Sequence, residues 1–205
     1  MTELKKGYIT PSSFSKIMAV RGLGKVAQDY ADEIVLDLLG VQRLSFTAPA
    51  TNWGIEKEQE AIDRYSLLTL QTVQKVEGAI YHPEIDFVKG TPDGLILELN
   101  GMIEVKCPYN PINHLSNIRN CQPEIWEMPK GSYLEDYWHQ VQGYLWITER
   151  DWCDFISYDP RFAPDEQIVI QRVYPNKKDI DALRERTAEF WTIVLDRIPS
   201  KYKTV

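Results

Sequence analysis

The sequence predicts an α/β (α+β) fold in which a mixed central β-sheet is flanked by helices. Two apolar runs surround Asn100-Gly101 and predict a β-hairpin within residues 90–108, because both central residues of a type I′ turn need positive φ. Other segments show strand alternation (152–158 and 167–174) or helical spacing (26–39, 53–70, 133–147 and 179–198). Strands in the middle of the chain, with helices before, between and after them, are typical of such a sheet.

Composition predicts a single domain over residues 1–205. The chain is long enough to bury a sizeable core, and its 43% hydrophobic and 26% charged content is ordinary for a globular protein. No apolar run is long enough for a membrane span, and the N-terminus lacks the apolar stretch of a signal peptide. The three cysteines, Cys107, Cys121 and Cys153, are odd in number and widely spaced, which predicts reduced thiols in a cytoplasmic protein.

The net charge of −7 sets a condition on any partner that is a nucleic acid. Phosphate binding depends on local positive charge, so this acidic chain is not expected to coat DNA nonspecifically. DNA binding would require clustered basic residues, metal ions that neutralise an acidic site, or subunits that assemble around the DNA.

The predicted hairpin brings charged side chains to one face. A two-residue turn at Asn100-Gly101 would pair Leu97 with Glu104 and Leu95 with Lys106. Because strand side chains alternate, Glu104 and Lys106 share a face, and Asp93 has the parity to join them. Ile103 and Val105, which alternate with these residues along the strand, are expected to point into the core.

Two carboxylates this close repel each other unless a cation lies between them. A few hard oxygen ligands suit Mg²⁺ or Mn²⁺, which keep several waters and take further ligands from a substrate phosphate. Lys106 could then hold the attacking water. The alternative is a hairpin whose charges simply face solvent.

The helix over 53–70 offers a third carboxylate. Glu58 lies on the apolar row that contains Ile55, Ile62 and Tyr65. A glutamate in a buried stripe is costly unless it is paired or bound to a metal, so Glu58 is a candidate ligand. A buried basic partner, or a side chain that reaches solvent, would explain it equally well.

Further segments bear on the site or on the fold. Thr10-Pro11-Ser12-Ser13 resembles a helix start near lysines, which suits either an anion site or an ordinary capped helix. The aromatic stripe of the helix over 133–147 indicates core packing, with Gln140 as its polar exception. Residues 109–132 read mostly as a long loop with a helical part at 114–120, and the loop is a candidate flap over the substrate. Strands are also expected at 73–81 and 86–89.

Pro92-Asp93 followed by Glu104-Val105-Lys106 resembles the PD-(D/E)XK nuclease signature. A wider set of motifs occurs in order and is similar to the lambda exonuclease (YqaJ-type) family of phage recombination nucleases. These motifs are Trp53-Gly54-x-x-x-Glu58-x-x-Ala61, Thr91-Pro92-Asp93-Gly94, Glu104-Val105-Lys106-Cys107-Pro108, Tyr137-x-x-Gln140-Val141-Gln142 and Tyr158-Asp159-Pro160-Arg161.

The resemblance implies a restriction-endonuclease-like PD-(D/E)XK core and a Mg²⁺-dependent, processive 5′→3′ exonuclease on linear double-stranded DNA. Such an enzyme releases mononucleotides from 5′-phosphorylated ends and leaves a 3′ single-stranded overhang for recombination by single-strand annealing. It implies two Mg²⁺ ions per site, with Mn²⁺ as a substitute, a ring-shaped homotrimer and a phage single-strand annealing protein as partner. It also implies a phage or prophage protein of the bacterial cytoplasm.

The same resemblance assigns roles to individual residues. Asp93, Glu104, Glu58 and the backbone carbonyl of Val105 match the metal ligands, and Lys106 matches the catalytic lysine. Gln140 matches the helix motif beside the active site, where it would contact the metal-bound water or the scissile strand, and Tyr137 of the same motif would lie near DNA. The 5′-phosphate positions match Ser12, Thr91 and Lys5, and Arg21 is a candidate for the DNA end. Lys5 stands where the family often has arginine, so it keeps the charge but loses the bidentate fork, and Lys6 could replace it.

Two classes of alternative stay open. One is another nuclease on the same core, either an endonuclease or a repair nuclease, although the spacing of the three cysteines does not match an iron–sulfur cluster. The other is a catalytically inactive adaptor that binds DNA ends, against which the intact Asp93, Glu104 and Lys106 argue.

Overall fold

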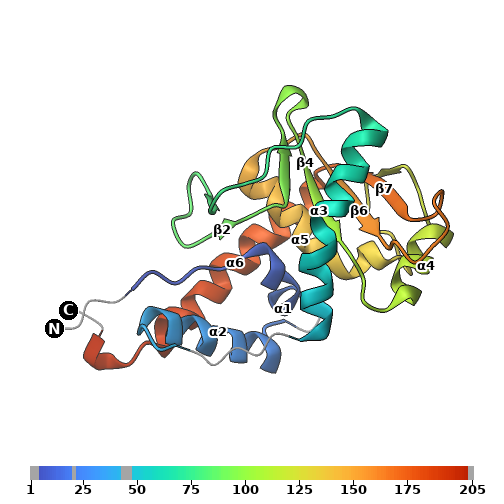
Figure 1. Ribbon diagram of the computed structural model, residues 1–205. Coiled ribbons are helices and arrows are strands. Elements are labelled where there is room, and N and C mark those ends of the chain that lie inside the picture. Colours follow the sequence, from blue (N-terminus) through green and yellow to red (C-terminus); the bar gives the residue numbers. More distant parts are fainter. Residues whose placement is uncertain (1–4, 20–21, 43–47, 203–205) are drawn as a thin grey trace.

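The computed structural model, which describes residues 5–19, 22–42 and 48–202, is built around a five-stranded mixed sheet. Helix α3 (Pro49–Thr69) covers one face, and α5 (Tyr133–Thr148) covers the other (Figure 1). The strand order is β3 (Gly94–Ile96), β4 (Gly101–Lys106), β6 (Trp152–Tyr158), β7 (Ile168–Val173) and β5 (Glu124–Ile125). This arrangement confirms the predicted fold class.

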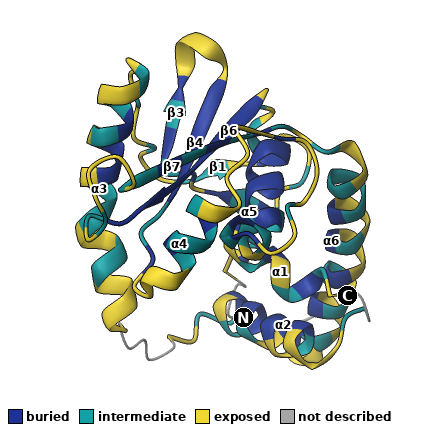
Figure 2. Ribbon diagram, turned by 90° about the vertical axis from the view of Figure 1, so that its right-hand side faces the viewer, coloured by how far each residue is buried: buried dark blue, intermediate teal, exposed yellow. Residues whose placement is uncertain are grey.

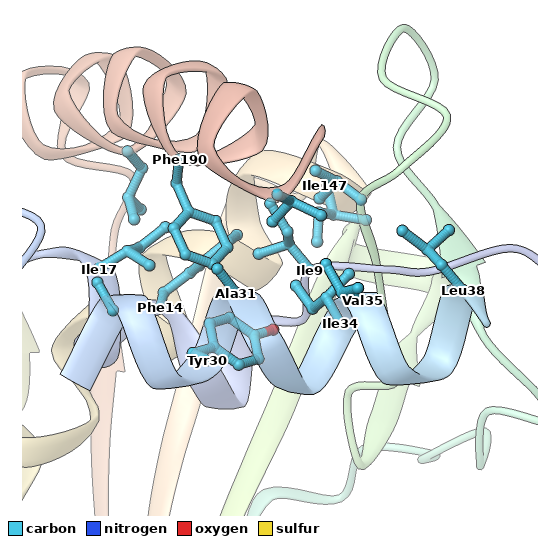
Figure 3. Close-up of a cluster of buried hydrophobic side chains, with 14 of the residues drawn as sticks. Ile9, Phe14, Ile17, Tyr30, Ala31, Ile34, Val35, Leu38, Ile147 and Phe190 are labelled. Atoms are coloured by element: carbon cyan, nitrogen blue, oxygen red, sulfur yellow. The ribbon is translucent and has the colours of Figure 1, made fainter. Parts of the chain in front are cut away.

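A third layer packs behind α5 and consists of α1 (Phe14–Ile17), α2 (Lys25–Leu38) and α6 (Lys177–Arg197). Its buried side chains form one hydrophobic cluster, in which the rings of Tyr30 and Phe190 stack with their centroids 5.3 Å apart (Figure 3). The N-terminal segment joins this cluster because Gly143 of α5 lets Phe14 approach; a Cβ at Gly143 would lie 2.3 Å from that ring. No helix of the described residues is long and apolar enough to cross a membrane.

The predicted pairing of the hairpin is wrong, although its faces are right. Leu95 lies opposite Met102, not Lys106, so the register differs from the prediction by four residues. Leu97–Leu99 form a 3₁₀ turn that ends in Asn100 at φ 51°, and the connection is therefore longer than two residues. An even shift leaves every side chain on its predicted face, because side chains alternate with a period of two.

Strand β4 divides its side chains between the two helix layers. Ile103 and Val105 pack against Ala61, Ile62 and Tyr65 of α3, whereas Met102 packs with the α5 cluster. Glu104 and Lys106 follow the parity of Met102 and therefore face α5. The sheet thus delivers two charged side chains to the helix that carries Gln140.

Several minor elements differ from their predictions. The strand expected at 73–81 is reduced to a bridge between Gln74 and Leu95 and to β1 (Ile80–Tyr81), because Gly78 between them adopts φ 84°. The strand expected at 86–89 is β2 (Lys89–Gly90), which pairs with β1. The loop expected at 109–132 contains α4 (Pro111–Arg119), capped by Asn110, and the edge strand β5.

Candidate active site

Glu104 stands at the centre of a polar cluster between β4 and α5. Its Oε1 accepts hydrogen bonds from Lys106 Nζ at 2.6 Å and from Gln140 Nε2 at 2.7 Å. The side chain is almost completely buried, with 1% of its surface exposed. Lys106 also lies over the ring of Tyr137, 4.5 Å from its centroid. Four sequence candidates therefore meet at one point: Glu104, Lys106, Gln140 and Tyr137.

Asp93 approaches the same cluster from the start of β3. Its Oδ2 accepts the backbone N–H of Val105 at 2.7 Å, so the carboxylate extends the pairing with β4 beyond Gly94, the first residue of β3. The chain can make this approach because residue 94 is glycine: a Cβ there would lie 2.3 Å from Val73. Pro92-Asp93-Gly94 therefore fixes a carboxylate beside the strand that carries Glu104.

The two carboxylates resist ionisation in this environment. Burial and the charge of Glu104 hold the pKa of Asp93 well above its usual value. Burial also raises the pKa of Glu104, although Lys106 partly offsets the effect. Burial lowers the pKa of Lys106, but Glu104 outweighs it and the pKa is raised, so Lys106 is a cation at neutral pH. If both carboxylates were ionised, the cluster would therefore carry more negative charge than its single lysine balances.

Asp93 and Lys106 open into a pocket of about 460 Å³, and Glu58 of α3 lines the opposite wall. The prediction that Glu58 lies on a buried stripe is wrong, because no residue of α3 before Ala61 is buried and Ile55 is 66% exposed (Figure 2). The N-terminal half of α3 forms the pocket wall instead of packing on the sheet. Glu58 is 30% exposed and is held by Lys75, whose Nζ lies 3.1 Å from its Oε1.

The chemistry of this group fits a hard divalent cation. Glu104 Oε2 is buried and has no hydrogen-bond partner among the described residues, which leaves a carboxylate oxygen free to act as a ligand. Within the described ranges no group of three or more His, Cys, Asp or Glu side chains is placed to hold a metal ion by itself. An open set of carboxylates is the arrangement that Mg²⁺ uses when waters and a substrate phosphate complete its shell.

The predicted 5′-phosphate residues fall in two places. Ser12 and Thr91 are exposed and flank a contact in which Pro11 packs against Gly90. Tyr144 lies between this contact and the cluster, since its ring edge approaches Gly90 and its hydroxyl is 3.5 Å from Gln140 Nε2.

Lys5 and Lys6 lie elsewhere, in a separate pocket of about 270 Å³ lined also by Leu38, Phe87 and Trp191. The structure therefore does not bring Lys5 together with Ser12. Arg21 lies outside the described residues.

Some pocket residues were not found from the sequence. Tyr133 and Tyr109 line the pocket, and the Tyr133 hydroxyl lies 2.9 Å from that of Tyr137. The aromatic stripe of the helix over 133–147 was the available signal for Tyr133, but it read as core. Nothing in the sequence connected Lys75 with Glu58.

Comparison with known proteins identifies the family. A model of the YqaJ-like viral recombinase domain matches residues 2–151. The chain belongs to this family. The predicted resemblance is thereby confirmed. The sequence has no match among curated proteins.

Solved structures agree with this assignment. The alkaline exonuclease LHK-Exo from Laribacter hongkongensis superposes with a TM-score of 0.80 at 30% identity, covering 94% of this chain and 90% of that one. The same enzyme in complex with dAMP gives a TM-score of 0.80 at 31% identity, with the same coverage of both chains. A phage-related exonuclease from Haemophilus somnus 129PT shares the fold, with a TM-score of 0.73 at 18% identity over 95% of this chain and 96% of that one. The fold is restriction-endonuclease-like, and the family and these neighbours support a phage-type nuclease.

Proposed function

We propose that the protein is a Mg²⁺-dependent, processive 5′→3′ exonuclease that degrades linear double-stranded DNA to mononucleotides and leaves a 3′ overhang. The observation that carries the proposal is the cluster in which Asp93, Glu104, Lys106 and Gln140 meet beside an open pocket. Similarity to a protein described as an alkaline exonuclease supports the choice of reaction.

Asp93, Glu104 and Glu58, with the backbone carbonyl of Val105, are the proposed ligands of two Mg²⁺ ions, which Mn²⁺ could replace. Bound there, the ions would lower the pKa of a water and neutralise charge on the phosphoryl group. Lys106, cationic and 2.6 Å from Glu104, orients that water. Gln140 fixes the rotamer of Glu104 by donating to the oxygen that Lys106 also contacts.

Ser12 and Thr91, beyond Tyr144, are the proposed contacts of the terminal 5′-phosphate, with Tyr137 beside the scissile strand. A terminal phosphate held there, while the carboxylates act on the next phosphodiester bond, would set a step of one nucleotide and the 5′→3′ direction. A homotrimeric ring, a phage single-strand annealing protein as partner and a cytoplasmic location in a bacterial host complete the proposal, and the chain's family supports them.

Digestion of linear duplex DNA, labelled separately at each end, tests the proposal. We expect Mg²⁺-dependent release of mononucleotides from 5′-phosphorylated ends, slower release from 5′-hydroxyl ends and no cutting of a closed circle. The Glu104→Gln variant is the inactive control, because it retains the shape of the side chain but not its charge. Cutting of the circle would replace the exonuclease by an endonuclease, and DNA binding without cleavage in Mg²⁺ or Mn²⁺ would identify an adaptor.

A further inference from the structure

The turn that follows β6 contains a buried ion pair. Asp159 is fully buried, and its Oδ1 accepts the backbone N–H and the Nε–H of Arg161 at 3.0 and 2.7 Å. Its Oδ2 accepts from Arg161 Nη2 at 2.7 Å. This bidentate contact fixes the plane of the guanidinium, because both parallel bonds must be satisfied at once.

The same guanidinium is attached to the pocket wall. Arg161 Nη2 also donates to the carbonyl oxygens of Pro108 and Tyr109, at 3.0 and 3.1 Å, and both residues line the active-site pocket. Trp53 of α3 lies against its face, 4.7 Å from the guanidinium carbon to the ring centroid. Two motifs that the sequence places far apart, around Trp53 and Asp159, thus meet at the rim of the pocket.

One nitrogen of the Arg161 guanidinium remains available. Its Nη1 makes no hydrogen bond within the described residues, and its side chain is 40% exposed. Lys106 and Lys75, in contrast, are each paired with a proposed metal ligand, Glu104 or Glu58. Arg161 is therefore a cation at the rim that does not compete with metal binding.

We propose that Arg161 binds a backbone phosphate of the DNA strand that enters the pocket, with Asp159 and the carbonyls of residues 108 and 109 holding its guanidinium in place. A side chain fixed in this way loses little rotamer freedom on binding, and the two N–H groups of its Nη1 can donate charge-assisted hydrogen bonds to phosphate oxygens. Because the chain has a net charge of −7, binding of DNA phosphates depends on local cations such as Arg161. The proposal rests on the proposed nuclease function.

The test is the salt dependence of DNA binding, measured in an Asp93→Asn background so that the DNA is not cut. We expect Arg161→Gln to weaken binding to a 5′-phosphorylated duplex about tenfold, and to reduce the slope of log K against log[salt] by about 0.9, the value for one phosphate contact. Arg184→Gln is the matched control: Arg184 is an exposed arginine on α6, and its loss should leave the slope unchanged.

Arg161→Gln leaves Asp159 buried without its partner and could unfold the turn. The double variant Asp159→Asn with Arg161→Gln removes both charges and keeps the test valid, as checked by its melting temperature. A folded variant with lower affinity but an unchanged salt slope would make Arg161 only a clamp of the pocket wall and overturn the proposal. If the parent Asp93→Asn protein binds no duplex at all, the proposed function fails first, and this proposal fails with it.

Discussion

Replacing Asp93 by asparagine is expected to stabilise the metal-free protein while it abolishes nuclease activity. Burial and Glu104 raise the pKa of Asp93 despite the hydrogen bond from Val105 and the nearby Lys106. A carboxyl whose pKa is raised by folding is one whose ionised form destabilises the fold. Asparagine removes the charge and can still accept the hydrogen bond of Val105.

The size of the gain follows from two opposing terms. Removal of a desolvated carboxylate charge beside a second carboxylate is favourable, whereas the change from a charged to a neutral acceptor for Val105 loses about 1 kcal/mol. Each kcal/mol of net gain corresponds to a melting temperature about 2 to 4 °C higher for a chain of this length.

The effect should depend on pH in a defined direction. An acid whose folded pKa is raised is neutral in both states at low pH and contributes no penalty there. As pH rises from the unfolded pKa of about 4 through the folded value, wild type loses stability and the variant does not. The difference in melting temperature should therefore grow with pH across this window.

Thermal unfolding in EDTA measures the stability gain of the metal-free variant, and thermal unfolding in excess Mg²⁺ measures how far the metal stabilises each protein. A cation bound only by the folded wild type adds about 2.7 kcal/mol at a hundred times its Kd, which should reverse the order of stability. Glu98→Gln, an exposed carboxylate on the same hairpin, is the matched control and should change neither curve. If the variant is no more stable than wild type in EDTA at any pH, Asp93 carries no ionisation penalty, and if Mg²⁺ stabilises both proteins equally, Asp93 is not a ligand.

Other substitutions separate catalysis from folding. Gln140→Leu removes the amide that orients Glu104 and should reduce nuclease activity about 10- to 100-fold; unchanged activity would remove Gln140 from the site. Glu58→Gln loses only a partly exposed ion pair, so we expect unfolding free energy within about 0.5 kcal/mol of wild type together with a higher Mg²⁺ requirement in the digestion assay. Asp154→Asn should destabilise by about 3 to 5 kcal/mol in urea unfolding, because Arg172 would lose its buried partner, and a smaller loss would mean that water replaces it.

The hairpin shows how far sequence patterns reach. Asn100-Gly101 correctly marks the reversal of the chain, but only Asn100 adopts positive φ. Gly101 is required for another reason: a Cβ there would lie 2.2 Å from the ring of Trp152 on the neighbouring strand. Such a tertiary contact leaves no local signal, so the pairing register of the hairpin could not be predicted. The sheet face of each side chain could be predicted, because it follows from strand alternation alone.

For the site residues, too, local spacing predicted some positions, whereas the tertiary structure determines the others. Asp93, Glu104 and Lys106 were found because all lie on one hairpin, where spacing determines side-chain direction. Glu58 was predicted to be more buried than it is, because helical periodicity does not reveal where a helix extends past the sheet on which it packs. The distance between Lys5 and the cluster depends on the path of the whole N-terminal segment, which residue spacing does not encode.

Diffraction from crystals soaked in Mn²⁺, recorded at the manganese absorption edge, would show whether Asp93 and Glu104 bind a metal ion. We expect anomalous peaks about 2 Å from carboxylate oxygens of both residues, and their loss in the Glu104→Gln variant. Peaks at any other cluster, or Mn²⁺-dependent cleavage that persists in Glu104→Gln, would contradict the proposed metal site.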